Sequence, residues 1–132
     1  MENRKLIYAF GEWLNEYIWN HFATFTFGKV QSVDTARYIF RCFMANLKKA
    51  ANYFRVIEFE KNSVHIHSLL GKTDDIPASV IEDAWKKEHG IAQVLPYDAN
   101  LGAAYYITKY VNSDKINWDF KLKNAVKVTC KQ

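Results

Sequence analysis

The chain has 132 residues, of which 49% are hydrophobic and 24% are charged, and its formal net charge is +4. This composition excludes a disordered tail, because that much apolar material can build a core, and the length fits a single domain spanning 1–132. Two cysteines far apart in the sequence exclude a disulfide framework, and no apolar run approaches the ~18 residues of a membrane span. We therefore expect a mildly basic, globular, cytoplasmic protein.

Apolar residues at helical spacing predict a helix over residues 4–20, ahead of the rest of the domain. The next segment, FATFTF at 22–27, alternates Phe with Ala or Thr, which is typical of a strand. A second helix, capped by Ser32 or Asp34, is expected to continue to about Ala51.

Residues 53–60 and 64–70 are rich in β-branched and aromatic residues, and the Lys-Asn-Ser turn between them predicts a hairpin. With Asn62-Ser63 at its tip, the two segments pair as antiparallel strands. A third helix is expected to begin at Pro77 and to end near Glu88.

A short strand over 91–97 precedes a helix that Asp98 or Asn100 would cap and that would continue to about Val111. The alternating segment 125–130 is expected to be a last edge strand. Helices thus interrupt a mainly antiparallel sheet. This order predicts an α+β fold of the ferredoxin-like or RNA-recognition-motif type.

The segment VHIHSLL places His65 and His67 on the same face of its strand. In the predicted hairpin, Glu60 faces His65 and Glu58 faces His67, with Cβ atoms ~5 Å apart. Two imidazoles and at least one carboxylate therefore converge in a set that suits a divalent metal. The alternative interpretation is that the histidines simply pair with the glutamates on a solvated sheet face.

The segment AAYYITKYV carries three tyrosines and a lysine on a predicted helix. Its apolar stripe is expected to comprise Leu101, Ala104, Ile107, Thr108 and Val111. The helical spacing then places Tyr106, Lys109 and Tyr110 on nearly the opposite side, with Tyr105 at the boundary as a packing residue. Tyrosine can act as a covalent nucleophile, and a lysine can stabilise developing phosphate charge. The alternative is that these tyrosines are aromatic filler.

Taken together, FATFTF, VHIHSLL and YYITKYV resemble the three motifs of rolling-circle replication initiators, the Rep-type HUH endonucleases of plasmids and small single-stranded DNA phages. The three motifs span residues 22–111. The most specific part is Tyr106-Ile-Thr-Lys109-Tyr110, which resembles initiators that carry two catalytic tyrosines on one helix. The resemblance implies a single nuclease domain whose two histidines lie on a central strand of the sheet.

The resemblance also implies a metal site and a chemistry. Two histidines and an upstream acidic residue would bind Mg²⁺ or Mn²⁺, which places the ligands at His65, His67 and Glu58, with Glu60 as the alternative acid. A tyrosine would attack a phosphate of single-stranded DNA, form a 5′-phosphotyrosine and release a 3′-hydroxyl that primes replication.

In the same resemblance, Tyr106 maps to the first nucleophile, Lys109 to the motif lysine, and Tyr110 to the second nucleophile of two-tyrosine members. The partner would be single-stranded DNA at a replication origin, bound by a monomer or dimer. Because the sequence contains no Walker A motif, we expect either the nuclease domain alone or a minimal initiator that borrows a host helicase. Candidate phosphate contacts are Arg37, Arg41, Lys48, Lys49 and the segment 115–131, and exposed bases could stack on surface aromatics.

Three other functions stay open from the sequence. A single-strand HUH transposase would share the size and the chemistry. A nucleic-acid-binding module of the recognition-motif fold would keep the histidines as structural residues and form no covalent adduct. A metallohydrolase would use bound water, so that Tyr106→Phe would leave cleavage intact.

Overall fold

The computed structural model describes residues 2–60, 62–111 and 116–128. Its elements follow the order α1 (Glu2–Leu14), β1 (His21–Thr26), α2 (Val33–Leu47), β2 (Asn52–Glu60), β3 (Ser63–Gly71), α3 (Ala78–Lys86), β4 (Ala92–Pro96), α4 (Ala103–Tyr110) and β5 (Ile116–Lys121). None of the helices described is long and apolar enough to cross a membrane.

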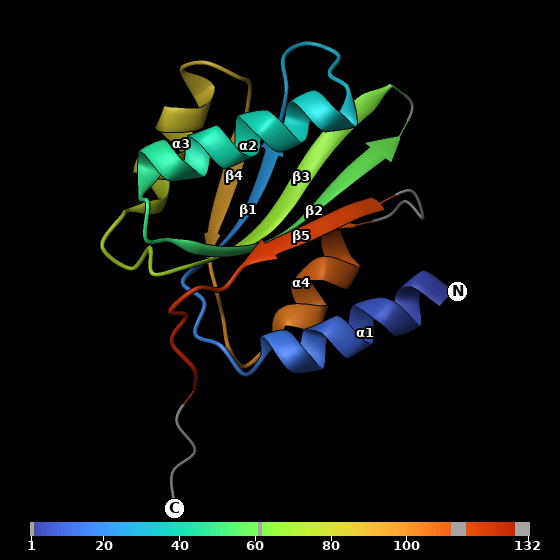
Figure 1. Ribbon diagram of the computed structural model, residues 1–132, viewed down its shortest axis with the longest axis vertical. Coiled ribbons are helices and arrows are strands. Elements are labelled where there is room, and N and C mark those ends of the chain that lie inside the picture. The colour runs from blue at the N-terminus through green and yellow to red at the C-terminus, as the bar shows by residue number, and fades with distance from the viewer. Residues whose placement is uncertain (1, 61, 112–115, 129–132) are drawn as a thin grey trace, which may run out of the picture.

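The five strands form one antiparallel sheet in the order β4-β1-β3-β2-β5 (Figure 1). The first four follow the ferredoxin-like order, with α2 connecting β1 to β2 and α3 connecting β3 to β4. The predicted fold class is therefore confirmed. The strand that carries VHIHSLL is β3, which lies at the centre of the sheet between β1 and β2.

Helices cover both faces of the sheet, because successive strand residues point to opposite sides. On one face, α2 and α3 pack on a cluster that includes Phe25 and Ile66. On the other face, α1 and α4 pack on a second cluster that includes Phe22 and Leu69, as Figure 1 shows. The two faces therefore carry separate cores, and the tyrosine helix α4 belongs to the second one.

Two helices end earlier than the sequence predicts. Helix α1 ends at Leu14 instead of near residue 20, and the indole of Trp19 donates a 2.8 Å hydrogen bond to the Leu14 carbonyl across the turn that follows. Helix α2 begins after the expected cap, Ser32, but ends at Leu47.

The last strand was expected at 125–130, and this prediction is wrong. The structure instead has β5, whose sequence INWDFK pairs with β2 along its whole length. Residues 125–128 contain only an isolated bridge between Lys127 and Tyr17. The remaining two residues of the predicted strand lie outside the described residues.

A close helix contact fixes α4 against α1. Gly11 of α1 is buried, and a Cβ added there would lie 2.5 Å from the Cβ and 3.0 Å from the backbone nitrogen of Ala104. Only a glycine permits this approach, because the atoms it faces include backbone that cannot move without shifting the helix. The position of the tyrosine helix therefore depends on Gly11.

We expect Gly11→Ala to destabilise the protein by about 1–3 kcal/mol, because overpacking outweighs the gain of up to ~1 kcal/mol in helix propensity. Urea unfolding followed by circular dichroism measures this change. Adding Ala104→Gly to the same chain removes the clashing methyl group and should recover part of the loss. A Gly11→Ala variant more stable than the parent would contradict the close contact.

Candidate active site

The pairing of β2 with β3 differs from the predicted hairpin. Glu58 lies opposite His65 and Glu60 lies opposite Ser63, so the predicted pairs Glu60–His65 and Glu58–His67 are wrong by two residues. Because side chains alternate with a period of two, an even shift leaves the face of every residue unchanged. The register brings Glu58, rather than Glu60, level with the two histidines.

Glu58, His65 and His67 form a compact cluster on this face. One ligand atom from each lies within 4.8 Å of the others, and the Nε2 atom of His67 is 3.1 Å from an Oε1 atom of Glu58. Glu58 is 3% exposed and His67 is 4% exposed, while His65 is half-buried and opens the cluster to solvent. Two imidazoles and a carboxylate at this spacing could hold a divalent cation of the Mg²⁺ to Zn²⁺ range.

Each imidazole also has a second partner that fixes the orientation of its ring. The Nδ1 atom of His67 lies 3.3 Å from the hydroxyl of Thr24, and the Nε2 atom of His65 lies 2.9 Å from the hydroxyl of Ser63. Such partners orient metal-ligating imidazoles in proteins. Sequence reasoning missed the role of Thr24, although the alternation of FATFTF places it on the same face as Phe22.

The tyrosine helix α4 begins later than predicted, and its first residues are held by another helix. Asp98 and Asn100 do not cap it; the N-cap is Gly102, whose φ of 81° is a left-handed conformation that favours glycine. The Ala103 N–H donates a 2.9 Å hydrogen bond to the side-chain oxygen of Asn15, just beyond α1. The end of α1 therefore supplies the acceptor that a local cap would have provided.

The side chain of Tyr106 is buried, which contradicts the predicted orientation of the helix. It is 4% exposed, and its ring lies 5.2 Å from the rings of both Phe22 and Tyr97. Its hydroxyl accepts a 2.8 Å hydrogen bond from the Asp98 N–H and donates one of 3.4 Å to the Pro96 carbonyl. In this conformation the hydroxyl is held by the loop that follows β4.

The expected apolar stripe of α4 is also partly wrong. Leu101 precedes the helix and is 47% exposed, and Ala104 and Thr108 are only half-buried. Ile107 and Val111 are buried as expected. Helix α4 is therefore rotated about its axis so that Tyr106 faces the sheet, and not only the small residues Ala104 and Thr108.

The Tyr106 hydroxyl lies away from the histidines along the sheet. Its partner Pro96 pairs with His21 on β1, whereas His67 lies level with Thr24. These two levels are three residues apart, which is roughly 10 Å along a strand. Tyr106 would have to leave its hydrogen bonds to reach a phosphate bound at the cluster.

Tyr110 contacts Phe22 as closely as the first motif tyrosine does. Tyr110 lies one helical turn beyond Tyr106, about 6 Å further along the axis of α4. The ring of Tyr110 is 5.1 Å from Phe22, which stacks at 6.4 Å on His67. No hydrogen bond among the residues that the structure describes engages the Tyr110 hydroxyl.

Lys109 lies beside Tyr110, as expected, and also bonds to Tyr105. Its Nζ atom donates a 3.0 Å hydrogen bond to the hydroxyl of Tyr105 and lies 5.5 Å from the ring centre of Tyr110. The bond to Tyr105 raises the pKa of Lys109 above its ordinary value, so the ammonium stays charged at neutral pH. Tyr105 is 36% exposed and its ring lies 5.3 Å from that of Tyr106, so it packs at the boundary of the helix face.

A shallow depression of about 590 Å³ lies between α4 and the loop after β4. Tyr105, Tyr106, Lys109 and Tyr110 all line it, but the cluster of two histidines and Glu58 does not. Burial and the neighbouring Tyr106 raise the pKa of a further lining residue, Tyr97, to about 12, which makes it a poor nucleophile. The tyrosine site and the candidate metal site are thus neighbours on one face, joined through Phe22.

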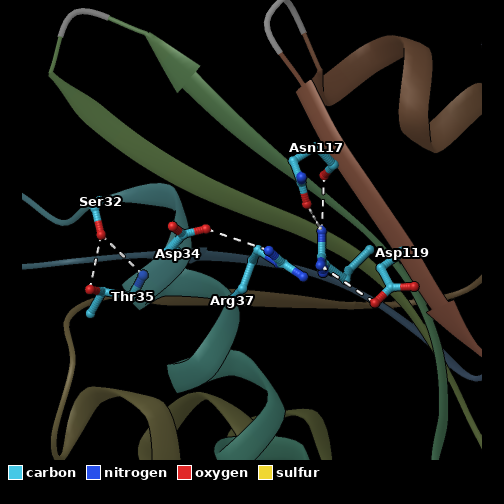
Figure 2. A network of polar contacts seen from close by, with 7 residues as sticks. Ser32, Asp34, Thr35, Arg37, Asn117 and Asp119 are labelled. Carbon is cyan, nitrogen blue, oxygen red and sulfur yellow. Dashed lines mark hydrogen bonds and ion pairs between the residues drawn. The ribbon is translucent and has the colours of Figure 1, made fainter.

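The four basic residues proposed to contact phosphate lie on the opposite side of the sheet. These are Arg37, Arg41, Lys48 and Lys49, in or just after α2. Arg37 is paired with Asp34 at 3.4 Å (Figure 2), and Lys48 with Asp75 at 2.9 Å. The structure therefore does not bring these four residues together with the cluster or with α4.

No protein-family model matches the chain, and neither does any curated protein or solved structure. Function must therefore be inferred from the cluster, from α4 and from the sequence motifs that they contain.

We expect the cluster to bind Mn²⁺, which isothermal titration calorimetry can measure on the intact chain. Glu58→Gln and His65→Ala should each weaken binding by at least about tenfold, because each removes one of three ligands. Binding should also weaken on acidification, because protons compete for imidazole and carboxylate. His89→Ala, outside the cluster, is the control, and equal affinity in all variants would exclude this site.

Proposed function

We propose that the chain is a divalent-metal-dependent endonuclease that nicks and joins single-stranded DNA through a tyrosine of α4. The observation that carries the proposal is the placement of Glu58, His65 and His67 within 4.8 Å of one another, on the sheet face against which α4 packs. The motif resemblance supports the same activity.

The chain would use its residues in separate roles. A Mg²⁺ or Mn²⁺ ion held by Glu58, His65 and His67 would polarise the scissile phosphate and neutralise its charge. The tyrosine oxygen attacks the phosphorus, and the bond from phosphorus to the 3′ oxygen of the upstream strand breaks. The tyrosine proton ends on that oxygen, so a 5′-phosphotyrosine and a free 3′-hydroxyl result. Lys109 lies beside the tyrosines with its charge available to a phosphate.

We assign the first attack to Tyr110 and the second to Tyr106, which reverses the order that the resemblance implies. The two rings lie equally close to Phe22, at 5.1 and 5.2 Å, but attack by Tyr110 breaks no hydrogen bond of the described structure. Attack by Tyr106 requires the release of two hydrogen bonds, at a net cost of roughly 1 kcal/mol each, and movement of a buried ring. A 3′-hydroxyl can later attack the phosphotyrosine and reseal the strand, because the ester exchange conserves bond energy.

The biological role that fits this chemistry is the initiation of rolling-circle replication at an origin. The 3′-hydroxyl would prime synthesis, with a host helicase opening the duplex in the cytoplasm of the host cell. A single-strand transposase would use the same chemistry. A water-using metallonuclease is the second candidate, favoured by the engagement of the Tyr106 hydroxyl with the backbone.

We expect the chain to form a covalent adduct with a mixed pool of single-stranded oligonucleotides in Mn²⁺, visible on denaturing gels and by intact mass. Tyr110→Phe should lower the adduct yield at least about tenfold, and Tyr106→Phe should lower it less. The Tyr106→Phe/Tyr110→Phe double variant and His65→Ala should form none. Tyr38→Phe, on the far face of the molecule, is the control.

Other outcomes of the same assay discriminate among the alternatives. Loss of the adduct in Tyr106→Phe alone would restore Tyr106 as the first nucleophile. Metal-dependent cleavage that persists without an adduct in the double variant would establish hydrolysis by water. Binding without cleavage, over a pool that contains every short sequence, would leave a nucleic-acid-binding module.

A further inference from the structure

The edge strand β5 exposes two large aromatic side chains that neither the cluster nor α4 explains. Trp118 is 40% exposed and Phe120 is 41% exposed. They pair with Val56 and Phe54 of β2, so both rings point to the face that carries the candidate metal site. Their exposure is unusual for residues of this size.

These rings belong to a continuous series, which we call the aromatic stripe. In order along the surface it comprises Tyr17, Trp13, Phe120, Trp118 and Phe10, with ring centres 6.1, 5.1, 6.3 and 4.5 Å apart. The planes of Trp118 and Phe120 are within 8° of parallel. Trp118 and Phe120 therefore present parallel ring faces, two residues apart on β5.

A buried arginine holds β5 in place from the opposite side of the sheet. Arg55 is 3% exposed and donates hydrogen bonds of 3.0 and 2.7 Å to the carbonyl and side-chain oxygens of Asn117. It also lies 3.7 Å from a carboxylate oxygen of Asp119 (Figure 2). The backbone that carries the stripe is thus fixed before any partner arrives, which lowers the entropy cost of binding.

The edge of β5 is poorly suited to pairing with another strand. The Phe120 N–H already donates a 2.9 Å hydrogen bond to the carboxylate of Asp119, the residue before it. A charged residue on an edge strand, with a backbone donor occupied, disfavours addition of a further strand. A partner is therefore expected to contact the faces of the rings rather than the edge of the sheet.

The stripe leads from a positive charge to the candidate metal site. At one end, the Nζ atom of Lys127 lies 5.6 Å from the ring centre of Tyr17 and 4.0 Å from a carboxylate oxygen of Glu16, an exposed pair from which a phosphate could draw the lysine. At the other end, Ile116 lies two residues before Trp118 on β5, about 7 Å away, and is level with Glu58. Planar rings between a lysine and a metal site match a chain of bases joined by phosphates.

We propose that the aromatic stripe is the track on which bases of single-stranded DNA stack as the strand enters the candidate active site. Trp118 and Phe120 stack on bases near the scissile phosphate, and Lys127 contacts a phosphate further along. The identity of the strand as DNA rests on the proposed function. The position of the track rests on the register of β5 and on the ring contacts.

The test is fluorescence anisotropy of a labelled mixed-sequence single-stranded DNA pool with the full chain in EDTA, where no cleavage occurs. Trp118→Ala and Phe120→Ala should each weaken binding by about tenfold, because each removes one stacking surface. Trp118→Phe, which keeps a ring and the core contact, should retain most of the affinity. Tyr38→Ala removes a ring on the far face that is more exposed than either Trp118 or Phe120, at 66%, and should change nothing.

The outcomes separate this proposal from the proposed function. Affinity that depends on Trp118 and Phe120 supports the track, even where the adduct assay is negative and the nuclease proposal has failed. An adduct that forms normally while both alanine variants, folded by circular dichroism, bind DNA as the parent does would overturn the track. A change of oligomeric state in Trp118→Ala without a change in DNA affinity would also overturn it, and would assign the stripe to self-association.

Discussion

The antiparallel pairing of β2 with β3 is the constraint on which the candidate site depends. It sets Glu58 beside the two histidines, and β1 on the other side of β3 adds Thr24 to the same face. If the pairing of the strands shifted by one residue, these polar side chains would point into the core beneath α2. Apolar side chains would then point to the opposite face. The buried apolar set of β3 therefore protects the geometry of His65 and His67, since any register that moves them also exposes the core.

The second requirement is that α4 lies firmly on that face. Three contacts provide this: Gly11 allows α1 to approach closely, Asn15 accepts the first N–H of α4, and Phe22 packs between His67 and the tyrosine rings. Of these residues, only Phe22 belongs to one of the three sequence motifs. The N-terminal helix, which precedes the three motifs, is thus part of the machinery that positions the tyrosines.

The sequence predicted which face of the sheet each hairpin residue points to, because side chains alternate along a strand. It did not predict which residues of the two strands pair with each other. Asn62 adopts a φ of 62°, which asparagine tolerates, and the turn therefore forms earlier than at Asn62-Ser63. Helical periodicity could not orient α4, because both sides of it carry aromatic or apolar residues and Tyr106 competes with smaller ones for the sheet. The strand at 116–121 was predictable from its alternation. The segment 125–130 alternates equally well. Only the pairing of 116–121 with β2, which the sequence does not reveal, distinguishes the true strand from the expected one.

The distribution of charge bears on how a nucleic acid could bind. The basic residues of α2 lie across the sheet from the site, partly neutralised by aspartates, so they cannot draw a phosphate into the cluster. Among the described residues near the tyrosines, Lys109 is the cation within contact of their rings. A site with so little fixed positive charge would depend on the metal for the scissile phosphate. Its remaining affinity would have to come from surfaces that recognise bases, and exposed parallel rings fixed on an edge strand are surfaces of that kind.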